Sequence, residues 1–124
     1  MAAGTKKSPD ERTLVAQVRV ETLQADERAA TLELVKGPGA PCTIRLTQDA
    51  MLIGRDPSVE IAIDSRELSR RHLRITRVGD EHMCLDQESV NGVFLNGVKI
   101  HSAVLRDGDQ LQLADCVFIY RGQA

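Results

Sequence analysis

The chain has 124 residues, 42% of them hydrophobic and 27% charged, which suffices for one folded domain with a modest core. Its formal net charge of -2 at pH 7 argues against a general nucleic-acid binder, which usually presents an extended basic face. No run is long and apolar enough to cross a bilayer, and no apolar stretch follows the lysines of residues 1–7, so we expect a soluble protein without a membrane partner.

Only 2% of the residues are aromatic, so the core must be built from Val, Ile and Leu, which favour strands. The three cysteines, Cys42, Cys84 and Cys116, are an odd number and lie far apart. Their spacing fits neither a disulfide framework nor a paired-cysteine metal site, and we expect no metal or cofactor. Cys84 and Cys116 have apolar neighbours and are predicted to be buried free thiols, which favours a reducing, cytoplasmic location.

Residues 1–29 are predicted to form an N-terminal extension that precedes the folded domain at 30–121. Residues 1–12 are small, polar and charged, which is typical of a mobile tail. Residues 13–23 alternate apolar and polar side chains as a strand does, although some of them also fit helical spacing. We favour an extended or partly ordered segment there.

From residue 31 onward, short aliphatic runs alternate with turn-forming residues. The Gly and Pro residues of 37–41 cannot continue a ladder, and Asn96-Gly97 suits a type I′ turn, whose two central residues both need positive φ. About 11 short strands without a convincing helix indicate an all-β domain, an antiparallel β-sandwich. The runs lie at 31–37, 42–46, 51–54, 60–63, 73–78 and 82–86, followed by a hairpin at 93–100 and strands at 111–113 and 116–121.

The last two strands are predicted to form a hairpin. We expect Leu111 and Leu113 to face the core before its turn, and Val117 and Ile119 to do so after it. A small sandwich gathers its irregular loops at its two ends, so function should lie on loops that a rigid frame holds in place.

The first candidate site residue is Arg55, which follows Gly54 at the end of an apolar strand. There its backbone would be fixed, while its guanidinium would be free to bind an anion. The simpler interpretation is a surface arginine that pairs with Asp56 or Glu60, and for an isolated arginine this is the more frequent outcome.

The second candidate is the run Ser69-Arg70-Arg71-His72. A hydroxyl followed by two guanidiniums on a loop resembles an anion site, because the planar guanidinium matches the geometry of phosphate. The alternative is a strand-entry loop whose arginines face water and whose serine is a turn residue.

The third candidate is the run Ser89-Val90-Asn91-Gly92. An asparagine presents both a donor and an acceptor, which suits recognition of another chain's backbone, and Gly92 permits a sharp turn with positive φ. Taken alone, this run is better interpreted as a plain Asn-Gly turn.

Taken together, the three runs are far more specific than any one of them. Gly-Arg, Ser-x-x-His and Ser-x-Asn-Gly occur in this order beside predicted strand ends, accompanied by Asp-Gly-Asp at 107–109 and Phe118 in the last strand. From about Ala30 to Arg121 the sequence resembles the forkhead-associated (FHA) domain family. The resemblance implies an FHA-type sandwich that binds phosphothreonine. It further implies a monomeric, non-catalytic signalling adaptor downstream of a Ser/Thr protein kinase.

The resemblance also implies roles for the polar residues of the motifs. Arg55 would contact the phosphate, and Ser69 would donate its hydroxyl to it. Either Arg70 or Arg71 would add a further contact, and Asn91 would hold the backbone of the ligand.

The resemblance implies that the other positions of the motifs support the binding site. Val90 lies where the family approaches the phosphate, and only its backbone N–H could take part. His72 would tie loops together, Ser89 would support the site, and Gly54 and Gly92 would meet backbone requirements. The family often has Thr after Asn-Gly, where this chain has Val93, and we expect little functional effect of that difference.

Two other function classes compete with this interpretation. Ser69 and His72 could suggest a nucleophile and base, but three residues apart they would not share the geometry of a catalytic pair. A phosphate-independent scaffold would hold its partner through another face, and equal binding of phosphorylated and unphosphorylated peptide would indicate it.

A regulatory hypothesis concerns the N-terminal extension, which contains Thr5, Thr13 and Thr22. If a kinase phosphorylates one of them, the extension could fold back onto Arg55 and Ser69, because a short tether gives an effective concentration on the order of millimolar.

Overall fold

The computed structural model describes residues 29–122, so the hypotheses about the N-terminal extension, including Thr5, Thr13 and Thr22, lie outside the described residues. Within residues 29–122 the chain forms eleven strands and no helix. Every predicted strand is present, and β9 is an addition to the prediction. The strands are β1 Thr31–Lys36, β2 Cys42–Arg45, β3 Ala50–Gly54, β4 Ile61–Ala62, β5 Leu73–Val78, β6 Glu81–Asp86, β7 Val93–Leu95, β8 Val98–Ile100, β9 Ser102–Leu105, β10 Gln110–Leu113 and β11 Cys116–Arg121.

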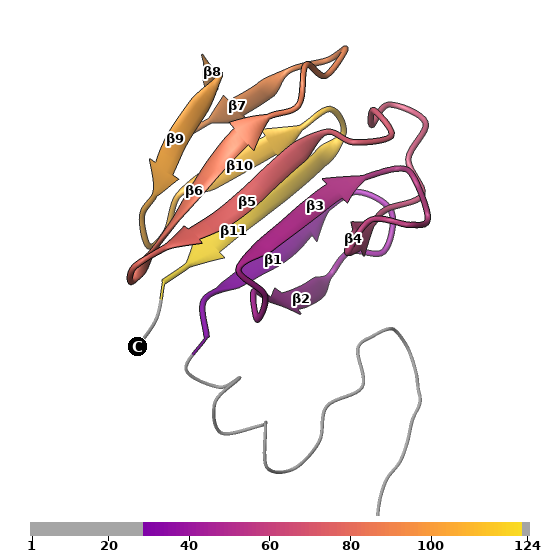
Figure 1. Ribbon diagram of the computed structural model, residues 1–124. Coiled ribbons are helices and arrows are strands. Elements are labelled where there is room, and N and C mark those ends of the chain that lie inside the picture. The colour runs from indigo at the N-terminus through magenta and orange to yellow at the C-terminus, as the bar shows by residue number, and fades with distance from the viewer. Residues whose placement is uncertain (1–28, 123–124) are drawn as a thin grey trace, which may run out of the picture.

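The strands form two sheets that pack face to face as a sandwich (Figure 1). The six-stranded sheet has the order β2-β1-β11-β10-β7-β8, and the five-stranded sheet has the order β4-β3-β5-β6-β9. Neighbouring strands are antiparallel, as expected, except that β3 and β4 pair in parallel with Ile53 opposite Ile61. The loop of residues 55–60 thus returns the chain to the side of Ile53, so that β4 runs in the same direction as β3.

The core between the sheets consists almost entirely of aliphatic side chains, as the composition predicts. Fully buried members come from both sheets, namely Leu32, Ile53, Leu73, Val93, Leu111, Leu113 and Phe118. Burying one such side chain contributes about 1.5–3 kcal/mol, so the inward faces of the strands account for most of the stability of the fold. Cys84 and Cys116 belong to the same core as free thiols, which confirms the prediction for both, whereas Cys42 is exposed.

The inward face of β11 differs from the prediction. Leu113 lies opposite Cys116 and Leu111 lies opposite Phe118, and residues directly opposite each other in an antiparallel pair project to the same side. Cys116 and Phe118 are therefore buried, while Val117 lies on the outer side of the sheet. The expectation that Val117 and Ile119 face the core was wrong by one residue, because the two-residue turn at 114–115 fixes the register.

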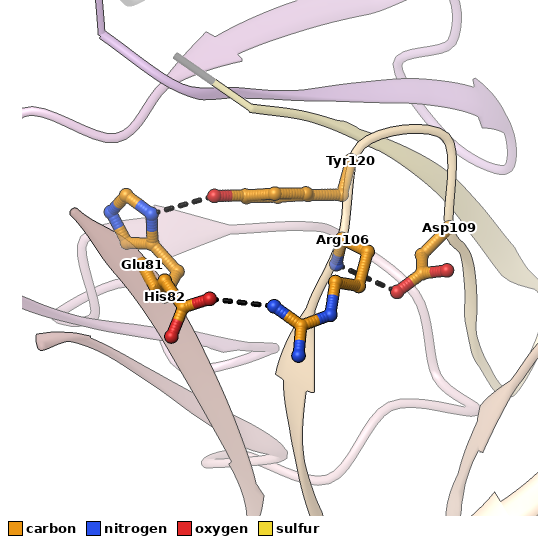
Figure 2. Close-up of polar contacts among 5 residues, drawn as sticks. All are labelled: Glu81, His82, Arg106, Asp109 and Tyr120. Atoms are coloured by element: carbon orange, nitrogen blue, oxygen red, sulfur yellow. Dashed lines mark hydrogen bonds and ion pairs between the residues drawn. The ribbon is translucent and has the colours of Figure 1, made fainter.

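A polar contact joins the two sheets near the start of β6 (Figure 2). His82 of β6 and Tyr120 of β11 are both buried, and His82 Nδ1 lies 2.8 Å from the hydroxyl of Tyr120. Beside them, Arg106 donates to Glu81 at 2.6 Å, and the backbone N–H of Arg106 donates to Asp109 at 2.8 Å. These bonds fix the end of the sandwich at which β6 begins.

At the other end, the strand register brings three loops together. Ile53 of β3 lies opposite Leu73 of β5, and Leu73 lies opposite Asp86 of β6. The end of β3, the start of β5 and the end of β6 are therefore neighbours, and the β3–β4, β4–β5 and β6–β7 loops leave from the same edge. All three predicted motifs lie on these loops. None of the described residues forms a helix that is long and apolar enough to cross a membrane.

Candidate functional site

Gly54 ends β3 at a point where the β4–β5 loop passes close to the backbone. A Cβ atom at Gly54 would overlap the carbonyl oxygen of Arg70, so only glycine fits here. The next two residues hold the same loop through their N–H groups. Arg55 donates to the carbonyl of Ser69 at 3.0 Å, and Asp56 donates to that of Arg70 at 3.2 Å. These bonds fix the backbone of Arg55 beside Ser69.

The side chain of Arg55 extends toward the same loop. Its Nε donates to the carbonyl oxygen of Leu68 at 3.1 Å, and the residue remains exposed. Its two suggested partners bind backbone instead, because Glu60 accepts an N–H of β3 at 2.8 Å and Asp56 accepts that of Ser58 at 2.9 Å. In the described part of the chain, neither carboxylate forms an ion pair with Arg55. The terminal guanidinium nitrogens therefore remain available to an anion.

Arg70 and Arg71 are both exposed on the β4–β5 loop. The hydrogen bonds from Ser58 are the main reason why the pKa of Asp56 lies below its usual value, and the positive charges of Arg71 and Arg70 lower it further. Both guanidiniums are thus near enough to Asp56, the neighbour of Arg55, to act on its charge. Arg55, Arg70 and Arg71 are thus three exposed arginines on these loops, which also carry carboxylates such as Glu67 and Glu88.

His72 is fully buried and connects two of the loops. Its Nδ1 accepts the backbone N–H of Ser69 at 3.1 Å, so Nε2 carries the ring proton and donates it to the carbonyl of Gly92 at 2.8 Å. Both ring nitrogens are thereby occupied by backbone groups. The ring does not contact the hydroxyl of Ser69, and a nucleophile–base pair would need that contact.

The hydroxyl of Ser69 faces the β6–β7 loop. Its Oγ accepts the backbone N–H of Val90 at 3.0 Å, so the N–H that we expected to be open to a ligand is already engaged. A hydroxyl that accepts one hydrogen bond still has its own proton to donate, and this proton is free to bind an incoming acceptor. Val90 itself is 88% exposed.

A series of local hydrogen bonds holds the rest of the β6–β7 loop. Asn91 Nδ2 donates to the carbonyl of Glu67 at 2.7 Å, which joins this loop to β4–β5. The N–H of Gly92 donates to Ser89 Oγ at 3.0 Å, and the N–H of Ser89 donates to Asp86 Oδ1 at 3.1 Å. Gly92 has a φ of +79°, which other residues adopt only with strain. The side chain of Asn91 is therefore placed by its own loop and by its neighbour.

Several residues that build this site escaped the sequence analysis. Glu67 and Leu68 act through their carbonyl oxygens, which no side-chain pattern reveals. Ser65 donates to Asp115 at 2.6 Å and ties the β4–β5 loop to the β10–β11 turn. Asp86 was missed as well, and the signal that could have found it is its position before a turn, where Asp often caps a backbone N–H.

Val93, the departure from the family pattern, lies in β7 and is fully buried. Its side chain belongs to the core and does not reach the surface of the loops. Among residues 29–122, no group of three or more His, Cys, Asp and Glu side chains is arranged so that it could hold a metal ion.

Comparison with known proteins agrees with this geometry. The family model of the FHA domain matches residues 51–114, which include all three motifs. An oxoglutarate dehydrogenase inhibitor of Corynebacterium jeikeium is 36% identical over 87 residues, 70% of this chain and 60% of that protein. The glycogen accumulation regulator GarA of Mycolicibacterium smegmatis is 35% identical over 85 residues, 68% of this chain and 54% of the regulator.

A solved FHA domain from a study of phosphothreonine-dependent interactions has a TM-score of 0.71 and 29% identity, over 77% of this chain and 98% of that one. The chain spans only 60% and 54% of the length of the two curated relatives. The likeness is therefore one of a domain rather than of whole proteins. The family match, the sandwich and the placement of the motifs agree, and the chain belongs to the FHA domain family.

Proposed function

We propose that residues 30–121 are a phosphothreonine-dependent protein-binding module, and that its ligand site lies where the β3–β4, β4–β5 and β6–β7 loops meet. The observation that carries the proposal is the convergence of three side chains on one short segment. Arg55 binds the carbonyl of Leu68, Asn91 binds that of Glu67, and the hydroxyl of Ser69 lies between their loops.

The proposed phosphate contacts follow from the groups that the loops leave free. A phosphothreonine carries nearly two negative charges and three acceptor oxygens. Arg55 offers its terminal nitrogens, and Ser69 offers its hydroxyl proton. Val90 acts through Ser69, because a hydroxyl that accepts a hydrogen bond becomes a better donor. Arg70 and Arg71 add charge at the rim of the site.

Asn91 is proposed to bind the backbone of the ligand. Its Nδ2 is engaged by Glu67, and its Oδ1 remains to accept an N–H of a bound peptide. Gly54, His72, Ser89 and Gly92 support the site, the first by its lack of a side chain and the other three through the backbone bonds described above.

The proposed role is that of a non-catalytic adaptor for a partner that a Ser/Thr kinase has phosphorylated. In its support, the relatives in Corynebacterium and Mycolicibacterium are named as an inhibitor and a regulator, and the solved neighbour comes from work on phosphothreonine-dependent interactions. Buried, unpaired Cys84 and Cys116 suit a reducing cytoplasm. We propose that the module acts as a monomer, without nucleic acid or membrane.

The proposal is tested by calorimetric titration with a phosphothreonine peptide and its unphosphorylated twin. Three or four hydrogen bonds to a charged group, at roughly 1.5–3 kcal/mol each, less the cost of ordering the peptide, predict micromolar binding of the phosphorylated peptide only. Arg55→Ala should weaken binding by about 2 kcal/mol, or about thirtyfold. The matched control is Arg74→Ala, which removes an exposed charge from the outer face of β5.

Equal affinity for the two peptides would contradict the proposal and favour the phosphate-independent scaffold. A phosphoserine peptide should bind about fivefold more weakly than phosphothreonine, because the loss of one buried methyl contact costs about 1 kcal/mol.

A further inference from the structure

Lys99 lies against the β6–β7 loop, although it comes from a different part of the sequence. It lies in β8, opposite Phe94 of β7. A Cβ atom placed on Gly92 would be 3.0 Å from Lys99 Cε and 3.7 Å from its Nζ. The stem of the lysine thus occupies the space that a side chain at position 92 would need, and its ammonium lies beside the loop that carries Val90 and Asn91.

This ammonium reaches the loop from another side than Ser69 does. Val93 is fully buried, so the next residue along β7, Phe94, projects outward, and Lys99 directly opposite it projects outward as well. Ser69 approaches Val90 from the β4–β5 loop. Asn91 and Gly92 therefore separate the proposed phosphate contacts from the charge of Lys99.

The charge of Lys99 is not neutralised within residues 29–122. The ion pairs of this part of the chain join Arg106 with Glu81 and Arg121 with Glu33. Two carboxylates near the loops are engaged elsewhere, because Asp86 accepts the N–H of Ser89 and Asp115 accepts the hydroxyl of Ser65. An exposed ammonium whose stem is held against a binding loop is a ready partner for a carboxylate on the ligand.

We propose that Lys99 selects for an acidic side chain in the ligand, at a position flanking the phosphothreonine on the Asn91–Gly92 side. This inference rests on the proposed function and adds the class of ligand, a phosphothreonine peptide with a nearby Asp or Glu. The pair is exposed, so we expect it to tighten binding by about two- to fivefold at low ionic strength, and less in salt.

The test is an aspartate scan of a neutral phosphothreonine peptide, with Asp placed at each flanking position in turn. Affinities are measured by calorimetry for the wild type, Lys99→Met and Lys36→Met. Lys36 is a matched control because it lies in the same row of the six-stranded sheet, linked to Lys99 through Val117, Gln112 and Phe94. It is four strands away, about 19 Å at the usual strand spacing.

The expected result is one flanking position at which Asp tightens binding to the wild type and to Lys36→Met, but not to Lys99→Met. The neutral parent peptide should bind all three proteins alike. The proposal is overturned if Lys99→Met keeps the same preference for Asp, or if no position responds to Asp in the wild type. It is also overturned if Lys99→Met weakens the neutral peptide as much as the acidic ones, since Lys99 would then contact the phosphate. If no phosphothreonine peptide binds at all, the proposed function fails, and this inference fails with it.

Discussion

The stability of the sandwich should depend on pH through His82, which is only 3% exposed. Its Nδ1 contacts the hydroxyl of Tyr120 across the two sheets, and its Nε2 has no hydrogen-bond partner in the described part of the chain (Figure 2). Its ladder neighbours are Leu105, which is apolar, and Arg77, which repels a positive charge. The pKa of His82 lies below its usual 6.5, mainly because the ring is buried and secondly because of the charge of Arg77. Glu81 beside it is paired with Arg106.

The sign of the effect follows from this lowered pKa. As the pH falls through 6.5, the usual pKa of histidine, the unfolded chain takes up a proton at His82 and the folded protein does not. The unfolded state therefore binds more protons, and the free energy of unfolding decreases toward acid. If the folded protein keeps His82 neutral, the loss between about pH 7.5 and about pH 5 reaches about 2 kcal/mol, which is its upper limit.

The measurement is urea unfolding at a series of pH values for the wild type, His82→Gln and His101→Gln. His101 is exposed and serves as the matched control. Titrating carboxylates affect all three proteins alike, so the difference between profiles isolates each histidine. His82→Gln should flatten the profile between about pH 7.5 and pH 5 by up to about 2 kcal/mol, and His101→Gln should not. A His82→Gln profile parallel to that of the wild type would refute the reasoning, whatever its absolute stability.

Two further predictions concern the core and the packing of the site. Burial is the main cause that raises the pKa of Cys84 to about 11 and that of Cys116 to about 12. Near neutral pH, iodoacetamide should therefore alkylate only Cys42 in the folded protein, but all three thiols in denaturant. Mass spectrometry counts the adducts, and rapid labelling of three thiols under native conditions would contradict the burial. Gly54→Ala should lower the free energy of unfolding by about 3 kcal/mol, because its Cβ would overlap a backbone carbonyl. Gly79→Ala, at a turn with open space and a φ of +62°, should cost only about 1–2 kcal/mol, and equal losses in urea unfolding would argue against the overlap.

The strands could be predicted because their turns are encoded locally. Asn96 and Gly97 both have positive φ, 51° and 85°, as a type I′ turn requires, and the hairpin follows from that pair alone. β9 was missed because only His101 separates it from β8, with no glycine or proline to mark a boundary, although the chain changes sheets there. Which residues of β11 face the core could not be predicted from the apolar pattern of the strand alone. It depends on the pairing register with β10, which the length of the turn at 114–115 sets.

The sequence predicted which residues of the candidate site lie close together, but not which groups they form hydrogen bonds with. The order of the three motifs beside strand ends placed Arg55, Ser69 and Asn91 on neighbouring loops. Their hydrogen bonds run instead to backbone groups of other loops, such as the N–H of Val90 and the carbonyl of Glu67. Such bonds depend on the path of each loop, and residue identity says little about that path. Lys99 shows the same limit, because its approach to the site follows from strand pairing.

Each of the three polar side chains forms one hydrogen bond within the protein and leaves other groups free for the ligand. Under the proposed function, this arrangement affects the affinity. Arg55 Nε donates to the carbonyl of Leu68, Asn91 Nδ2 donates to that of Glu67, and Ser69 Oγ accepts the N–H of Val90. Each side chain is therefore held in place before a ligand arrives. Ordering a flexible side chain on binding costs about 0.5–1.5 kcal/mol. Because these side chains are already ordered in the free protein, part of that loss of entropy does not occur on binding. Free energy from the phosphate contacts can then appear as affinity even though the site is exposed. The same bonds couple the loops, so the effects on binding of substitutions at two of these side chains should not simply add.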